Sequence, residues 1–202
     1  MDAGHDGSRI VRRLDARRMP WKNGGGETIQ IAVHPMNSLV DSFGWRISLA
    51  RVDSDGFFST FLGVDRSLTV LDGVGLSLAV GAGPPVLVTA RDEPHRFPGE
   101  ANCFARLLDG PVTALNAMVD RDAFACVVSR LYPARECRGL AGAVTVLVCV
   151  EGELETDLGL VGHHDALIVH AESAVRIKSR GAPARAVAAT FRPLRRGGAG
   201  QG

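Results

Sequence analysis

Bulky apolar residues alternate with polar or small ones along many short stretches of this chain. A period of two residues predicts β-strands whose two faces differ. The clearest stretch is 45–50, where apolar side chains at 45, 47 and 49 alternate with polar or small ones at 46, 48 and 50. A second alternating stretch covers 66–71, and an acidic residue followed by glycine favours a turn after it at 72–73.

The same kind of pattern recurs along the whole chain and predicts an all-β fold. Twenty-four glycines and ten prolines separate short β-branched runs, and helical periodicity is scarce. Twelve short strands are more than one small sandwich needs, but they suit two. The expected strands cover residues 28–33, 45–51, 66–71, 76–80, 86–89, 103–108, 112–119, 124–128, 144–150, 166–170, 174–178 and 185–191.

A weak internal sequence repeat, called the echo below, supports two β-domains in the chain. In both 68–76 and 147–154 an apolar strand is closed by an acidic residue and glycine and is then reopened by an apolar residue. Gly73 and Gly152 are separated by about the length of a small jelly roll, which predicts two related β-barrels in tandem. We expect the first barrel, with the first strands, in residues 9–125 and the second in 126–194. The Gly-rich, polar ends, 1–8 and 195–202, are expected to be disordered tails.

Arg46 and Arg66 stand near the openings of two successive predicted strands. In one interpretation both are surface residues, and Asp65 pairs with Arg66 in solvent, where such a pair contributes less than about 1 kcal/mol. In the other, both guanidinium groups lie in a barrel mouth, where they can bind a carboxylate in a bidentate manner. Spacing along the sequence does not decide between them.

Charge and termini exclude several classes of protein. The 23 basic residues are balanced by 22 acidic ones, so the net charge of +1 gives no reason to expect a nucleic-acid partner. No apolar run reaches the roughly eighteen residues of a membrane span, and the polar N-terminus lacks the apolar segment of a secretory signal. We therefore expect a cytoplasmic protein that binds neither nucleic acid nor membrane.

Metal and cofactor chemistry find little support in the sequence. The four cysteines, Cys103, Cys126, Cys137 and Cys149, are too widely spaced for a CxxC pair, and only Cys137, between two arginines, is a candidate reactive thiol. The adjacent pair His163 and His164 would point to opposite faces if it lay in a strand, which argues against a shared ion. We expect no metal and no cofactor.

Catalytic groups are equally hard to identify. Ser48 and Ser59 have no histidine at a recognisable spacing, and the aspartates at 53, 55, 65 and 72 resemble turn residues. The segment 19–28 contains three consecutive glycines, which suit either a loop that cradles an anion or a flexible turn before an edge strand. It matches neither the P-loop nor the dinucleotide fingerprint.

The Gly-rich loop and six further blocks resemble the HutD/Ves family, in family order over about residues 9–122. The blocks are 20–28 (PWKNGGGET), 45–50 (WRISLA), 56–59 (GFFS), 63–66 (GVDR), 71–73 (LDG), 97–99 (FPG) and Gly110-Pro111 followed by Asn116, Met118 and Arg121. The resemblance implies a bicupin, which is two jelly-roll barrels in one chain, and a small ligand in the context of histidine utilisation. One departure is Ala114, where the family usually carries an acidic residue.

Together these observations predict a metal-independent bicupin that binds a small anionic molecule. Under the resemblance, the ligand would be an acidic intermediate of histidine catabolism, such as N-formylglutamate or urocanate, and the role accessory or regulatory. We expect no catalytic residue and a homodimer. The expected ligand-binding residues are Arg46, Arg66, Asn116, Ser48, Lys22, Asn23, Trp21, Trp45, Phe57, Ser59, Asp65 and Met118. Two alternatives stay open: a cofactor-independent isomerase or hydrolase of an amino-acid-derived acid, and a structural partner protein with a vestigial pocket.

Overall fold

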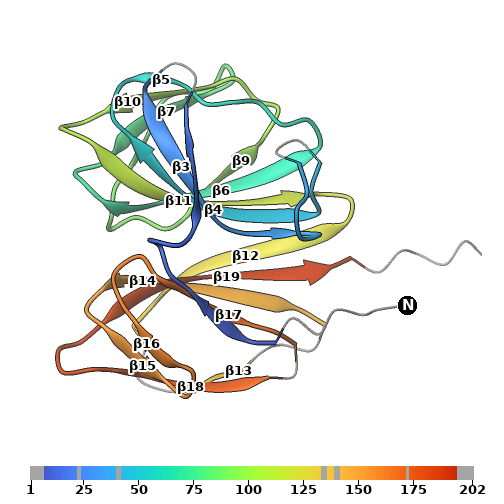
Figure 1. Ribbon diagram of the computed structural model, residues 1–202. Coiled ribbons are helices and arrows are strands. Elements are labelled where there is room, and N and C mark those ends of the chain that lie inside the picture. Colours follow the sequence, from blue (N-terminus) through green and yellow to red (C-terminus); the bar gives the residue numbers. More distant parts are fainter. Residues whose placement is uncertain are drawn as a thin grey trace, which may run out of the picture.

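The computed structural model describes residues 7–21, 24–39, 42–132, 136–138, 142–171 and 173–194. These residues form nineteen strands and no helix, so the described part of the chain contains no helix that could cross a membrane. The strands build two barrels that lie one against the other (Figure 1). The predicted all-β fold is therefore confirmed.

The first barrel consists of a six-stranded and a four-stranded sheet. The large sheet has the order β2-β3-β4-β11-β6-β9 and the small sheet the order β5-β10-β7-β8. The strands are β2 (Arg17–Pro20), β3 (Gly26–His34), β4 (Trp45–Val52), β5 (Gly56–Phe57), β6 (Val64–Asp72), β7 (Leu76–Val80), β8 (Val86–Val88), β9 (His95–Pro98), β10 (Cys103–Leu107) and β11 (Val112–Asp120).

The second barrel repeats this arrangement. Its large sheet has the order β1-β17-β14-β19-β12 and its small sheet the order β13-β18-β15-β16. The strands are β1 (Arg9–Val11), β12 (Phe124–Leu131), β13 (Glu136–Arg138), β14 (Val144–Glu151), β15 (Leu154–Thr156), β16 (Gly159–Val161), β17 (Ala166–Val169), β18 (Ala174–Ser179) and β19 (Arg185–Pro193).

The eight strands from β4 to β11 correspond in order to the eight from β12 to β19. Spatial neighbours β4-β11-β6-β9 in one large sheet match β12-β19-β14-β17 in the other, and β5-β10-β7-β8 match β13-β18-β15-β16. The echo seen in the sequence is the β6–β7 turn and its counterpart, the β14–β15 turn. Both Gly73 (φ 92°) and Gly152 (φ 74°) adopt positive φ there, which favours glycine.

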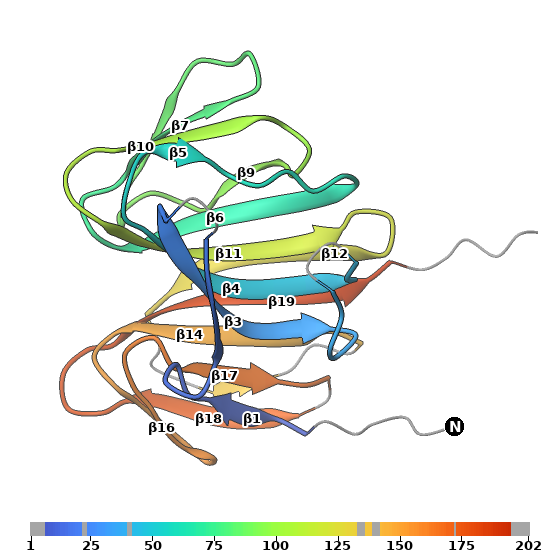
Figure 2. The same cartoon turned by 45° about the horizontal axis from the view of Figure 1, so that its top comes forward.

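The large sheets of the two barrels pack face to face and form a shared core (Figure 2). From the first barrel β4 contributes Ile47 and Leu49, and from the second barrel β14 contributes Val146 and Val148. Burial of each such aliphatic side chain stabilises the fold by about 1.5–3 kcal/mol. One continuous core between the barrels explains why no long linker is needed.

The N-terminus crosses between the barrels. β1 pairs with β17 of the second barrel, whereas β2 pairs with β3 of the first. The first barrel was expected to begin at residue 9, but β1 belongs to the second barrel, and the expected boundary at 125–126 falls inside β12. Of the expected tails, residues 1–6 and 195–202 lie outside the described residues, while the Ser8 hydroxyl accepts a hydrogen bond from the His170 amide at 3.1 Å.

Candidate functional site

A cavity of about 580 Å³ lies inside the first barrel. Its volume is in the range that holds a small molecule. The lining side chains come from six strands, from the residue after β2 and from the segment after β5. They are Met19, Pro20, Trp21, Thr28, Arg46, Ser48, Ala50, Phe57, Phe58, Ser59, Phe61, Arg66, Leu68, Asn116 and Met118.

The alternation along β4 decides which residues reach this cavity. Its odd positions, such as Ile47, enter the core between the barrels, so its even positions, Arg46 and Ser48, point into the first barrel. The polar face of β4 is thus as buried as the apolar one: Arg46 is only 4% exposed. A surface position for the two arginines, the first of the two interpretations of the sequence, is excluded.

Arg46 carries a buried charge with little compensation. Its Nε is buried and has no hydrogen-bond partner, and no ion pair with a carboxylate is found for Arg46 among the described residues. Burial, and secondarily the charge of Arg17, lower the pKa of this guanidinium. A buried charge without a partner is costly, so this position favours an anion.

Arg66 enters the same cavity from β6 and is 5% exposed. Its Nη1 donates to the Ser59 carbonyl at 3.1 Å, and its Nε lies 3.5 Å from Oδ1 of Asn116. Its guanidinium carbon lies 4.9 Å from the ring centroid of Phe97 and 5.4 Å from that of Phe58. Burial lowers its pKa to about 10, and the nearby Arg46 charge acts in the same direction, yet the group remains cationic at neutral pH.

Two polar side chains lie beside the arginines at matched strand positions. Asn116 of β11 is the register partner of Ser48 on β4, and Met118 is the partner of both Arg46 and Arg66. The four side chains therefore lie on the inner face of three adjacent strands. Ala114, where the family resemblance leads one to expect a carboxylate, is fully buried in the apolar cluster of this barrel.

Aromatic residues form the rest of the wall. The Trp21 indole Nε1 donates to the Thr28 hydroxyl at 2.9 Å, and its ring packs edge-on against Phe58 at 6.2 Å. Phe58 and Phe61 were not among the predicted site residues. The cluster of phenylalanines at 57–61 was the signal that could have identified them, because any of the three could reach the cavity.

Of the twelve predicted residues, eight line the cavity: Trp21, Arg46, Ser48, Phe57, Ser59, Arg66, Asn116 and Met118. Trp45 instead lies in the core between the barrels, stacked on Phe191 with ring centroids 4.4 Å apart. Lys22 and Asn23 lie outside the described residues. The predicted set is thus largely brought together, but Trp45 belongs to the opposite face of β4.

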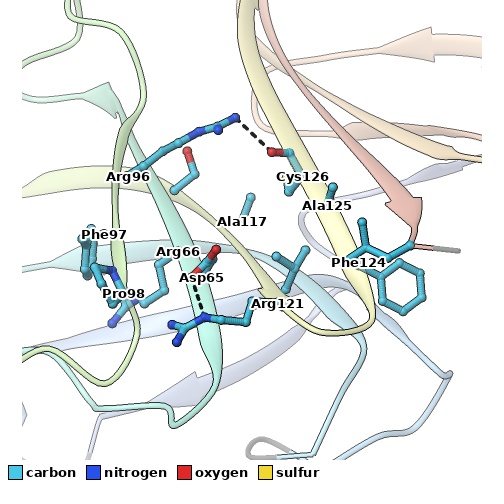
Figure 3. A pocket seen from close by; sticks show the side chains of 13 residues that line it. Asp65, Arg66, Arg96, Phe97, Pro98, Ala117, Arg121, Phe124, Ala125 and Cys126 are labelled. Atoms are coloured by element: carbon cyan, nitrogen blue, oxygen red, sulfur yellow. Dashed lines mark hydrogen bonds and ion pairs between the residues drawn. The ribbon is translucent and has the colours of Figure 1, made fainter. Parts of the chain in front are cut away.

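Asp65 also lies outside the cavity, and it does not pair with Arg66. It accepts a hydrogen bond from Arg121 at 2.9 Å (Figure 3). Arg121 in turn donates to both carboxylate oxygens of Glu100. Asp65 and Arg121 border a second, inter-barrel pocket of about 450 Å³. There Arg96 donates to the Cys126 carbonyl at 2.9 Å, so the pocket's arginines are already engaged with protein groups.

The Gly-rich loop leads into an internal strand, because β3 lies between β2 and β4. The expected alternative of a turn before an edge strand is therefore corrected. Position 26 requires glycine for a steric reason, because a Cβ there would lie 2.0 Å from the carbonyl oxygen of Arg51. Close backbone approach accounts for at least this glycine without a ligand.

The structure also corrects the expectation that His163 and His164 point to opposite faces of a strand. They lie in a turn, not in a strand, and His164 has a φ of 63°. Both rings therefore point the same way and stack with centroids 3.8 Å apart. Burial, and then the neighbouring His163, lower the pKa of His164.

The thiols near these sites are poorly suited to reaction. Cys103 and Cys149 are fully buried, and burial raises the pKa of Cys103 and raises that of Cys149 to about 11. Thiolates are the reactive form, so both residues are packing groups. The side chain of Cys137, the predicted reactive candidate, lies outside the described residues.

Sequence comparisons identify similar proteins. The HutD family model matches residues 13–187. The chain is 41% identical over 107 residues to a Pseudomonas putida protein named "Uncharacterized 21.2 kDa protein in hutC 3'region", a match covering 53% of this chain and 55% of that protein. It is 36% identical over 141 residues to protein Ves of Cronobacter sakazakii, covering 66% of this chain and 75% of that protein. The chain thus spans about half the length of the first relative.

Structural comparisons agree with the fold. HutD from Pseudomonas fluorescens SBW25 superposes with a TM-score of 0.80 at 27% identity, covering 93% of this chain and 99% of that one. A conserved protein of unknown function from Pseudomonas aeruginosa PAO1 superposes with a TM-score of 0.79 at 29% identity, covering 92% of this chain and 98% of that one. A cupin 2 conserved barrel domain protein from Leptotrichia buccalis shares the fold alone. Its TM-score is 0.56 at 8% sequence identity, and the match covers 91% of this chain and 100% of that one.

Proposed function

The chain belongs to the HutD family, and from this premise we propose that its first barrel binds a small carboxylate in an accessory or regulatory role in histidine utilisation. The family match and the relative encoded in the hutC 3′ region support the link to that catabolism. An acidic compound such as N-formylglutamate or urocanate has the chemistry that the cavity favours.

One observation carries the proposal: two arginines, each at least 95% buried, line one cavity without a carboxylate partner among the described residues. Removing a charge from water costs several kcal/mol unless an opposite charge compensates it. A bound carboxylate would supply that charge and would accept charge-assisted hydrogen bonds from the planar guanidinium groups.

The neighbouring groups suit the remainder of such a ligand. Ser48 and Asn116 can orient a second polar group, and the rings of Phe57, Phe58 and Trp21 offer an apolar wall. Two charge-assisted contacts with apolar burial are compatible with micromolar affinity, about −8 kcal/mol.

The lining favours binding over turnover. A general acid or base must lie within hydrogen-bond reach of the proton that it moves. The described lining contains neither a carboxylate nor a histidine, and Asp65, the acid considered in the sequence, contacts Arg121 outside the cavity. The isomerase or hydrolase alternative therefore lacks an observation in its favour.

A titration of carboxylates tests the proposal. Isothermal titration calorimetry of metal-stripped protein would use formate, N-formylglutamate, urocanate and glutamate, with the diamide of N-formylglutamic acid as a neutral counterpart. We expect at least one carboxylate to bind, and Arg46→Met to weaken its binding at least about tenfold, because one charge-assisted contact contributes about 1.5–3 kcal/mol.

Arg51→Met is the matched control, since Arg51 lies on the same strand but is exposed and pairs with Asp53. It should bind like the wild type. Equal affinity in Arg46→Met and the wild type, or equal binding of the neutral compound, would overturn the proposal; absence of any carboxylate binding would favour the structural-partner alternative.

A further inference from the structure

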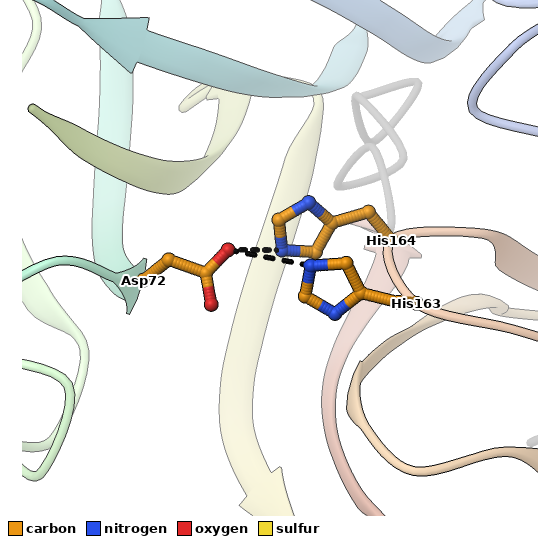
Figure 4. A group of neighbouring side chains, drawn as sticks. All are labelled: Asp72, His163 and His164. Atoms are coloured by element: carbon orange, nitrogen blue, oxygen red, sulfur yellow. Dashed lines mark ion pairs between the residues drawn. The ribbon is translucent and has the colours of Figure 1, made fainter.

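A second cluster of polar groups lies between the barrels, away from the residues that line the cavity. Asp72 is the last residue of β6 in the first barrel, and His163 and His164 lie in the turn before β17 in the second (Figure 4). Oδ2 of Asp72 lies 3.5 Å from Nε2 of His163 and 3.0 Å from Nε2 of His164. Potential ligand atoms of the three residues all lie within 4.8 Å of one another.

The protein fixes which nitrogen of His163 faces the aspartate. Its Nδ1 lies 2.8 Å from the carbonyl oxygen of Val150. A carbonyl only accepts hydrogen bonds, so Nδ1 carries the hydrogen, and in the neutral ring Nε2 presents a lone pair toward Asp72. Such a bond from the distal ring nitrogen to a carbonyl is the arrangement that orients metal-binding histidines.

His164 adds a second nitrogen that lacks a partner. The residue is 5% exposed, and its buried Nε2 makes no hydrogen bond of acceptable geometry, although Asp72 is close. Two imidazole nitrogens and a carboxylate oxygen thus converge on one point. In the tautomer that leaves the His164 Nε2 unprotonated, acceptor groups would face one another there without a cation between them.

The turn that presents the histidines is held firmly. The Asp165 amide donates to the Gly162 carbonyl at 2.9 Å, and the His164 amide donates to the Cys149 carbonyl of β14 at 2.8 Å. The Asp165 carboxylate receives hydrogen bonds from Arg12 at 2.7 Å and from the Arg13 amide at 2.9 Å. The two rings are therefore positioned before any ligand arrives, which is what a selective metal site requires.

We propose that Asp72, His163 and His164 form a site for one divalent transition-metal ion, and that Zn²⁺ fits it best. Zn²⁺ bound by nitrogen and oxygen at about 2.0–2.1 Å in a tetrahedron separates neighbouring ligand atoms by about 3.3 Å. The 3.0 and 3.5 Å separations bracket that value. The fourth position would be taken by water, and the half-exposed side chains of Asp72 and His163 leave a path from solvent.

Because its ligands come from both barrels, the ion would act as a clasp between them. It would tie the end of β6 to the turn before β17, beside the shared apolar core. This inference goes beyond the cavity and does not depend on carboxylate binding, so Arg46→Met should leave metal binding unchanged.

The test is calorimetry of untagged, chelator-treated full-length protein with ZnCl₂, followed by thermal unfolding with and without the ion. We expect binding of one Zn²⁺ per chain and a higher Tm in its presence. His163→Gln and Asp72→Asn should each weaken binding at least about tenfold and abolish the rise in Tm. The exposed position of His163 makes its replacement compatible with folding, which near-UV circular dichroism would verify.

Matched controls remove a histidine and an exposed aspartate elsewhere: His95→Gln and Asp122→Asn should bind Zn²⁺ like the wild type. Co²⁺ in place of Zn²⁺ should give the intense visible absorption of a tetrahedral site, lost in His163→Gln. Failure of the wild type to bind Zn²⁺, or unchanged affinity in both His163→Gln and Asp72→Asn, would overturn the proposal and leave an ordinary hydrogen-bonded His–Asp cluster.

Discussion

The two barrels share one strand order but differ at the positions that face their interiors. In the first barrel, Arg66 of β6 is the register partner of Met118 on β11, and Met118 pairs with Arg46 on β4. In the second barrel the corresponding partners are Thr145 of β14, Thr190 of β19 and Val127, which is 60% exposed on the edge strand β12. Both arginines of the first barrel are thus replaced by smaller, uncharged residues in the second.

The difference extends to the neighbouring polar group. Asn116, opposite Leu68, corresponds to Ala188, opposite Leu147. The second interior is filled by apolar side chains: Leu147, Cys149, Leu154, Val161, Leu167, Val169, Val175, Ile177, Ala184 and Ala186. One scaffold therefore supports a polar cavity or a packed core, depending on a few inward positions.

The most severe way to break this contrast is to place an arginine in the packed barrel. Thr145→Arg would install the counterpart of Arg66 where no cavity is prepared for it. We expect a loss of about 3–5 kcal/mol in the free energy of unfolding, because the charge would be buried without a partner. Urea denaturation measures this loss, and Lys178→Arg, at an exposed position of the same barrel, is a conservative control that should stay within about 0.5 kcal/mol of wild type. A loss below about 1 kcal/mol would show that the second barrel tolerates charge.

The reverse change tests whether the first barrel gives up stability for its cavity. Arg66→Met removes a buried charge and keeps an apolar side chain of similar length. We expect the ligand-free protein to gain about 1–4 kcal/mol, because buried ionic groups are often less stabilising than apolar replacements. Urea denaturation with an unchanged m-value checks it. A marked loss would instead assign Arg66 to stability, through its contacts with Ser59 and the surrounding phenyl rings.

How far the sequence predicts the fold depends on the length of each strand. All twelve predicted strands exist, because each carries enough apolar residues for its period to be recognised. The seven strands that were not predicted, β1, β2, β5, β9, β13, β15 and β16, have two to four residues. In β2, for example, the sequence RRMP has no alternation, and the strand exists because it pairs with β3. Such strands are determined by tertiary pairing.

The site was predictable where the alternation held. It places Arg46 and Ser48 on one face of β4, and applied consistently it assigns Trp45 to the other face, where the structure has it. Asp65 is excluded from the Arg66 face for the same reason. The histidine cluster could not be predicted, because it depends on a left-handed His164 in a turn and on Asp72 from the other barrel.

The smallest expected change in the free energy of unfolding concerns Thr145, the counterpart of Arg66 in the second barrel, and its register partner Thr190. The hydroxyls of Thr145 and Thr190 lie 3.0 Å apart and satisfy each other. Thr145→Val alone should cost about 1–2 kcal/mol, because it leaves the Thr190 hydroxyl without its partner. The double variant, with valine at both positions, should return to within about 1 kcal/mol of wild type, since both polar groups are removed together. Urea denaturation of the four proteins gives the coupling energy directly.

If instead the two losses simply add, the hydroxyls do not interact, and the second barrel contains unpaired polar groups just as the first contains unpaired charges. The contrast between the two interiors would then be one of charge alone, not of polar satisfaction.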